Sequence, residues 1–202
     1  MVFYLFGSII FLLVIYVMVI RPVHLKWGST QEELEYNYPG DTIVSDPDFN
    51  AVRAITINAK PEDIWPWIVQ IGSGKAGWYS IDMIDNGGIK SSESILPEYQ
   101  HIEIGQFIPF TPDRQNGMWV KDYEKSKFIL WTDQERMATW LWYLFDKGDA
   151  TRLITKLRTK YKWRSIWIIY YLIYDIGDIL MMKKCMKGIK GRVETPIVYG
   201  NK

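Results

Sequence analysis

Hydrophobic and polar positions follow different periods along the chain, and these periods predict where strands and helices lie. Residues 51–58 alternate with a period of two, which is typical of a strand with two unlike faces. Residues 61–71 open with a proline and two acids and then place apolar side chains at helical spacing, which predicts a helix. Pro66 lies inside that helix and removes one backbone hydrogen bond, so we expect a kink or a restart there.

The second half of the chain has the pattern of several strands followed by one long helix. The predicted strands are residues 107–110, 118–123, 128–132, 139–145 and 152–160. Residues 146–149 (DKGD) join the last two strands as a hairpin turn. Residues 163–190 predict a helix that is apolar in its first half and carries lysines in its second. This order predicts an α+β fold in which a twisted antiparallel sheet packs against the last helix.

The first 20 residues contain no charged side chain, and Arg21 and Pro22 follow them. A helix over residues 1–20 would rise about 30 Å, the thickness of the hydrocarbon core of a bilayer. The stretch lacks the basic start and the small-residue cleavage site of a signal peptide, so we expect an uncleaved transmembrane anchor. Residues 21–50 then read as a polar connector. Arg21 and Lys26 follow the span, which favours a single-pass membrane protein with a cytoplasmic globular domain.

Composition and charge exclude several classes of protein. The 202 residues suffice for one domain, and 48% hydrophobic with 23% charged residues is typical of a globular chain. A net charge of +1 gives no general attraction for nucleic acid. Cys185 is the only cysteine, which excludes an internal disulfide and fits a reducing compartment. The two histidines, His24 and His101, are far apart in sequence, so we expect no metal site, and nothing indicates a cofactor.

Several short motifs occur together in residues 51–194. They are residues 64–72 (IWPWIVQIG), residues 77–80 (GWYS) with Asp82, Asp85 and Asn86, then Ile95, Pro97, Glu98, Gln100 and Gly105, residues 151–153 (TRL), and residues 182–194 with Met186, Gly188, Arg192 and Glu194. In combination they resemble the START-like (Bet v 1-like, SRPBCC) superfamily, and more narrowly a bacterial-type branch of it. Gln106 departs from that pattern, because many members carry an acidic residue after the glycine.

The resemblance implies the helix-grip fold over residues 51–194, followed by a tail over residues 195–202. In this fold a curved antiparallel sheet wraps around a long C-terminal helix, two short helices follow the first strand, and a cavity lies between sheet and helix. Most members bind or carry apolar small molecules, and a minority are cyclases, dehydratases or other enzymes. The fold alone does not decide between these activities.

The loop after the first predicted helix is a candidate for the mouth of a cavity. Trp78 and Tyr79 offer flat apolar walls with a polar tip, and Asp82 follows closely. Alternatively, the acidic and amide side chains of this loop, Asp85 and Asn86 among them, bond to nearby backbone and only hold the loop together.

The C-terminal helix has an apolar side that we expect to face the sheet. Asp178, Met182 and Met186 lie on this side with Cys185, and the lysines share the other side. A carboxylate directed at an apolar interior is costly unless it is paired or hydrated. Asp178, and with it Asp175, therefore either meets a polar group of a ligand or lies solvated beyond the sheet edge. The methionines either form an adaptable pocket wall or fill the core.

The last two predicted strands leave the orientation of their faces open. Trp140 and Trp142 lie on one face of the first of them, and Leu141 and Tyr143 lie on the other, so alternation does not show which face is interior. A filled pocket on one side and a membrane or partner contact on the other would explain two apolar faces. The next strand carries its basic residues on one face, which we expect to point outward. There they would either be solvated or contact anionic lipid headgroups; they are Arg152, Lys156 and Arg158.

Catalytic chemistry has little support, and binding is the leading hypothesis. No GxSxG motif, phosphate-binding loop or dinucleotide fingerprint is present, and pairing Cys185 with His101 requires a helix cysteine that is usually inert. We expect a membrane-anchored domain that binds or transfers a lipid-like or aromatic molecule between sheet and C-terminal helix. The predicted ligand-binding residues are Trp78, Tyr79, Asp82, Trp140, Trp142, Asp178, Met182 and Met186.

Two alternatives to binding and transfer remain open. One is a cyclase- or dehydratase-like enzyme that uses an acid in the cavity, with Asp82, Glu98 and Asp178 as the candidates. The other is a protein-interaction domain that has no cavity. The sequence identifies neither the ligand nor the oligomeric state.

Overall fold

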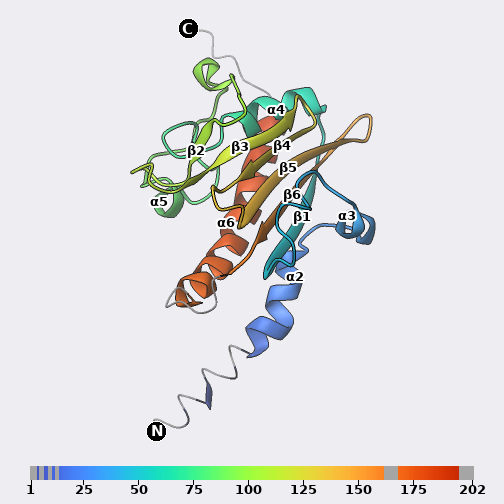
Figure 1. The fold of residues 1–202 in the computed structure, drawn as a ribbon. Helices are drawn as coiled ribbons and strands as arrows, with labels where there is room; N and C mark the ends of the chain where they lie inside the picture. The colour runs from blue at the N-terminus through green and yellow to red at the C-terminus, as the bar shows by residue number, and fades with distance from the viewer. Residues whose placement is uncertain (1–3, 5–6, 9–10, 12–13, 162–167, 196–202) are drawn as a thin grey trace.

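A six-stranded antiparallel sheet is the centre of the computed structural model, which describes residues 4, 7–8, 11, 14–161 and 168–195 (Figure 1). Its strands are β1 (Phe49–Ile57), β2 (Phe107–Pro109), β3 (Gly117–Glu124), β4 (Phe128–Thr132), β5 (Ala138–Asp146) and β6 (Thr151–Thr159). They lie in the order β1-β6-β5-β4-β3-β2, so the first strand pairs with the last. The predicted strands are confirmed to within two residues at each end, and the β5–β6 hairpin has the predicted turn.

Helices cover one face of the sheet, which we call the inner face. The helices that follow β1 are α4 (Pro61–Val69), α5 (Asp82–Asp85), the 3-10 turn η2 (Pro97–Tyr99) and α6 (Ile168–Glu194). Helix α6 runs behind the sheet in Figure 1, with α4 beside its upper part. This is the α+β helix-grip arrangement that the sequence predicts. Helix α4 continues through Pro66 without the restart that was one of the two expectations, and Glu62, whose carbonyl loses the bond that the proline withholds, is exposed to water.

The opposite, outer face is covered by the chain's own residues 31–44, which begin with α3 (Gln31–Glu35). Thr30 and Glu33 form a capping box that fixes the start of α3. Tyr38 then packs against outward side chains of the sheet, among them Leu141 and Tyr143 of β5. Strand β5 is apolar on both faces because protein covers both, so its outer face needs no membrane or partner to cover it.

The basic side chains of β6 pair with acids of the same covering segment. Arg152 Nε lies 2.7 Å from Glu33 Oε1, and Lys156 Nζ lies 2.7 Å from Asp41 Oδ1. Arg158 Nη2 donates to the carbonyl of Val44 at 2.8 Å. The expectation of solvated or headgroup-binding cations on this strand is therefore wrong, because partners more than 100 residues earlier in the chain hold them.

The N-terminal part holds a π-helical turn, η1 (Tyr16–Ile20), followed by α2 (Arg21–Leu25). Among the described residues, none of the helices combines the length and the apolar character needed to traverse a bilayer. The prediction of a single-pass membrane protein anchored by residues 1–20, with its globular domain in the cytoplasm, is corrected by this finding. A charge-free stretch meets the length requirement only as one continuous helix. Much of the predicted span, residues 1–3, 5–6, 9–10 and 12–13, lies outside the described residues.

After α2 the chain runs along the outer edge of β1 and protects that edge strand. The amide of Ala54 donates to the carbonyl of Trp27 at 3.1 Å, and Ser29 Oγ donates to the carbonyl of Val52 at 2.9 Å. Gly28 between them has φ +73°, and a Cβ there would lie 2.1 Å from the Ala54 oxygen. The segment thereby brings Arg21 and His24 close to β1 and α6.

Replacing Gly188 of α6 by alanine should destabilise the fold, because the new Cβ would lie 2.2 Å from the backbone oxygen of Tyr79. We expect G188A to lower the free energy of unfolding by about 1–3 kcal/mol, as overpacking does. Gly191, three residues later, has open space around its Cβ position, so G191A is the matched control. It should raise stability by up to about 1 kcal/mol through helix propensity. Urea unfolding of both variants checks this, and equal effects would contradict the close α6–Tyr79 contact.

Candidate functional site

Four tryptophans meet on the inner face of the sheet; we call them the indole cluster. Trp131 lies on β4, Trp140 and Trp142 lie on β5, and Trp78 comes from the loop after α4. Trp78 stacks on Trp140 with ring centroids 5.6 Å apart and planes 5° apart, and Trp131 meets Trp140 edge-on at 5.3 Å. All four side chains are buried. The face of β5 that the sequence left undecided is thus settled: Trp140 and Trp142 point inward.

The hydrogen bonding of the indole cluster is incomplete. Trp140 Nε1 donates to Thr155 Oγ1 at 2.8 Å. The indole N–H groups of Trp78, Trp131 and Trp142 are buried and have no acceptor among the described residues. A buried donor without an acceptor costs about 1–3 kcal/mol, and native folds keep few of them. Three in one cluster indicate that acceptors belong there.

The loop that carries Trp78 is fixed by its own polar groups. Tyr79 has φ +54°, its amide donates to Ser91 Oγ at 2.9 Å, and its hydroxyl donates to the carbonyl of Trp67 at 3.1 Å. Burial raises the pKa of Tyr79, so the phenol remains a donor. Asp82 accepts from both the amide and the hydroxyl of Ser91, at 3.1 and 2.5 Å. Tyr79 and Asp82, predicted as ligand-binding residues, are engaged within the loop and hold Trp78 in place.

The same internal bonding applies to the other polar residues of this loop. Asn86 Nδ2 donates to the carbonyl of Ile89 at 2.6 Å, and Asp85 Oδ2 accepts from the amide of Ile81 at 3.3 Å. Burial raises the pKa of Asp85. The self-capping alternative of the sequence analysis therefore describes these two residues.

Two arginines and two aspartates lie together where α6 crosses β1; we call them the charge cluster. Arg21 Nε lies 2.5 Å from Asp175 Oδ2, and Arg53 Nη2 lies 2.7 Å from Asp178 Oδ2. Arg53 and both acids are less than 10% exposed. Arg53 Nε also donates to the carbonyl of His24 at 3.0 Å. Asp178 is thus neither solvated nor aimed at an empty interior, because an arginine from β1 compensates its charge.

The ionisation of Asp178 is set by two opposing effects. Burial raises the pKa of Asp178, and the charge of Arg53 works against that rise. Removing either partner would leave an uncompensated buried charge, which costs several kcal/mol. The pair therefore fixes the position of α6 on the sheet more than it adds stability.

Strand register joins the charge cluster to the indole cluster. Arg53 of β1 lies opposite Thr155 of β6, which lies opposite Trp142 of β5. Two residues before Trp142 on β5, Trp140 lies opposite Trp131 of β4. A polar row therefore crosses the inner face, from a buried arginine through a threonine hydroxyl to an indole N–H without an acceptor.

Met182, Met186 and Cys185 of α6 are buried in the same core as the indole cluster. Burial raises the pKa of the Cys185 thiol, which keeps it protonated and unreactive. His101 is exposed and lies 2.7 Å from Glu103, so no cysteine–histidine pair forms. Among the described residues no group of histidine, cysteine or carboxylate side chains is arranged to hold a metal.

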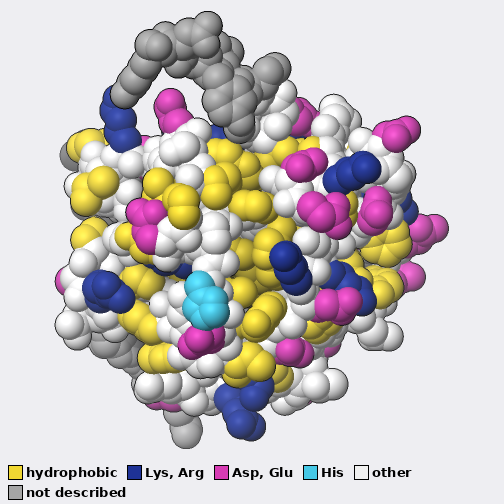
Figure 2. Space-filling model, turned by 90° about the horizontal axis from the view of Figure 1, so that it is seen from above, with side chains coloured by type: hydrophobic (Ala, Val, Ile, Leu, Met, Phe, Trp, Pro, Cys, Tyr) yellow, Lys and Arg dark blue, Asp and Glu magenta, His cyan; other side chains and the backbone are white. Residues whose placement is uncertain are grey.

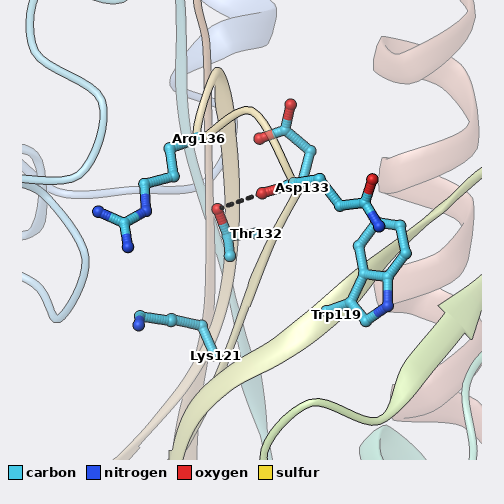
Figure 3. A pocket seen from close by; sticks show the side chains of 6 residues that line it. Trp119, Lys121, Thr132, Asp133 and Arg136 are labelled. Carbon is cyan, nitrogen blue, oxygen red and sulfur yellow. Dashed lines mark hydrogen bonds between the residues drawn. The ribbon is translucent and has the colours of Figure 1, made fainter.

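A shallow hollow of about 260 Å³ lies on the surface beside β3 and β4 (Figure 3). Its lining residues are Trp119, Lys121, Thr132, Asp133, Gln134 and Arg136. Asp133 Oδ1 accepts from two amides of its own turn, those of Met137 and Ala138. None of the residues predicted to bind ligand lines this hollow.

Sequence reasoning missed Arg21, Arg53, Trp131 and Thr155 as members of the site. Arg53 carried a signal, because it stands among apolar residues on the inward face of its strand. Trp131 stands in a strand with no polar alternation, so its direction could not be read. Arg21 was taken for a residue that flanks a membrane span, whereas it pairs with Asp175.

Replacing Trp140 and Trp142 separately by phenylalanine should test the hydrogen-bond inventory of the indole cluster. Both indoles are buried, and of the two only Trp140 has an acceptor among the described residues. We expect W142F to lose less stability than W140F, by about 1 kcal/mol, because it removes a donor that nothing satisfies. Urea unfolding of chain stripped of small molecules gives the comparison. A larger loss for W142F would contradict the inventory.

Comparison with protein families and curated proteins does not assign this chain to a family. No protein-family model matches this chain, and no curated protein matches it. The superfamily resemblance therefore rests on the sequence motifs and on the helix-grip arrangement itself.

Several solved structures resemble the fold at low identity. One is a conserved protein of unknown function from Enterococcus faecalis, with 16% identity and a TM-score of 0.47 over 76% of each chain. A protein from Mesorhizobium loti has 11% identity and a TM-score of 0.45, over 72% of this chain and 96% of that one. A Polyketide_cyc-like protein from Corynebacterium glutamicum has 16% identity and a TM-score of 0.36, over 72% and 85%. These values are too low to carry a function over to this chain.

Proposed function

We propose that this chain binds a small molecule with an apolar body and hydrogen-bond acceptor oxygens between the sheet and helix α6. The observation that supports this most directly is the set of three buried indole N–H groups without acceptors, on Trp78, Trp131 and Trp142. Phenylalanine would fill the same space without the cost of an unsatisfied donor. Indoles are favoured where a guest supplies the acceptors, because ring faces and N–H groups then both contribute to binding.

In this proposal the four tryptophans have different tasks. Trp78, Trp131 and Trp142 donate to ligand oxygens, and Trp140 supplies a ring face while its own N–H stays on Thr155. Met182 and Met186 contribute adaptable apolar surface from α6. The helix-grip arrangement and the START-like motifs agree with an aromatic or lipid-like guest in this position.

A catalytic role of the cyclase or dehydratase kind is favoured less. Such chemistry needs an acid or base that can reach the ligand. Asp82 is bonded to Ser91, and Asp178 is paired with Arg53. Glu98, the third candidate acid, is exposed on η2.

A protein-interaction role has little apolar surface to support it on the described part of the sheet, because residues 31–44 cover Leu141 and Tyr143 of the outer face and leave only the end of β5 exposed, at Phe145. Exposed apolar side chains do occur around α5, at Met83, Ile84 and Ile89. On the face drawn in Figure 2, hydrophobic side chains are interspersed with charged ones. Scattered apolar residues of this kind are normal for a protein surface.

Binding can be tested with prodan, a neutral naphthalene dye that carries one carbonyl acceptor and fluoresces further to the blue in a dry environment. We expect the full chain to bind it with a blue shift. Because one carbonyl oxygen accepts at most two hydrogen bonds, one or two of the variants W78F, W131F and W142F should weaken binding about tenfold, the effect of one lost hydrogen bond.

W140F is the matched control, because it makes the same change of ring at an indole whose N–H the ligand does not need. It should weaken binding less than the most affected of the other three variants. Absence of a blue shift with the wild-type chain, or equal weakening by all four variants, would refute the proposed role of the indole N–H groups.

A further inference from the structure

The charge cluster is balanced in charge but incomplete in hydrogen bonding. Two arginines face two aspartates, one turn apart on α6. Asp175 Oδ1 is buried and accepts from no described residue. Arg53 Nη2 lies 2.7 Å from Asp178 Oδ2, and because this nitrogen carries two hydrogens it can pair with that carboxylate and still donate a second hydrogen bond. The buried charge cluster therefore holds an acceptor, Asp175 Oδ1, and a donor, Arg53 Nη2, that can each form a further hydrogen bond.

Tyr16 of η1 adds a further donor to this place. Its hydroxyl is buried and has no partner among the described residues. Burial, and then the charge of Asp175, raise the pKa of Tyr16 to about 12, so the group stays protonated. The amide of Arg21 donates to the carbonyl of Tyr16, so Tyr16 lies one helical turn before the arginine that pairs with Asp175.

The charge cluster and the indole cluster are close enough for one small molecule to contact both. Arg53, Thr155 and Trp142 lie opposite one another on three adjacent strands. Neighbouring strands are about 4.8 Å apart, so Arg53 and Trp142 are separated by about 10 Å across the inner face. A molecule with two or three fused rings spans such a distance.

We propose that the charge cluster binds a hydroxyl group at one end of the ligand whose body lies on the indole cluster. This inference rests on the proposed function and adds the class of ligand. A hydroxyl can donate to Asp175 Oδ1 and accept from Arg53 Nη2 or Tyr16 Oη at the same time. A carboxylate or an ammonium group would leave one buried charge unbalanced in a cluster that is neutral by itself. The ligand is therefore a neutral, hydroxylated aromatic compound.

Calorimetric titration of the full chain at pH 7 tests this with three probes of similar size. They are 2-naphthol, 2-methoxynaphthalene and 2-naphthoate. We expect 2-naphthol to bind at least tenfold more tightly than either of the others, because the ether cannot donate and the carboxylate is charged. Equal affinity for 2-naphthol and 2-methoxynaphthalene would overturn the hydroxyl site and leave ordered water as the occupant of the cluster.

The variant D175N provides a second and independent test, because it removes one negative charge and leaves Arg21 without an ionic partner. We expect D175N to reduce the preference for 2-naphthol over 2-naphthoate at least tenfold from its wild-type value. D41N is the matched control, since it breaks an ion pair of Lys156 on the outer face of the same sheet. It should leave the ratios unchanged.

The two proposals fail in different ways. If none of the three probes binds and prodan also fails, the proposed function is refuted. If all three bind with similar affinity and D175N leaves their ratios unchanged, the hydroxyl site is refuted while the proposed function stands. A change of ratio with D41N as large as with D175N would likewise refute the hydroxyl site.

Discussion

The ion pair between Arg53 and Asp178 fixes how helix α6 lies on the sheet. Both side chains are nearly fully buried, and a shift of α6 by one residue would separate them. An unpaired charge at this depth costs several kcal/mol, so only one register of the helix is favourable. The contacts further along α6 follow from that register. Gly188 meets the backbone of Tyr79 at one site, and Lys190 reaches the carbonyl of Thr56 at another.

With the helix in place, the two faces of the sheet have separate roles. The outer face is closed by residues 31–44, whose Glu33 and Asp41 match the basic side chains of β6. The inner face combines large indole rings with polar groups that have no partner in the part of the chain that the structure describes. On the outer face Arg158 Nε is also buried without a partner among the described residues, but the inner face gathers three such indole donors around large apolar rings, which is a pattern expected of a binding site.

The local pattern of the sequence was enough to predict the helices and strands, but not the contacts between residues far apart in the chain. The predicted strands of residues 139–145 and 152–160 on either side of the DKGD turn gave the β5–β6 hairpin, and the helical wheel of α6 placed Met182 and Met186 on the buried side. The pairing of Asp178 with Arg53 joins positions 125 residues apart, which periodicity does not reveal. The direction of β5 was undecidable because both of its faces are apolar, and the covering segment was read as a free connector. The membrane anchor was inferred from a charge-free stretch of spanning length without signal-peptide features, and no helix in the described part of the chain is long and apolar enough to confirm it.

The most direct test of the account is native mass spectrometry of the full chain, purified gently from cells, followed by identification of any small molecule that is released. The account predicts one neutral, oxygen-containing, apolar compound per chain, and a lower occupancy for W142F than for W140F. A chain that emerges empty, and that also takes up no prodan, would contradict the central claim that the indole cluster is a binding site.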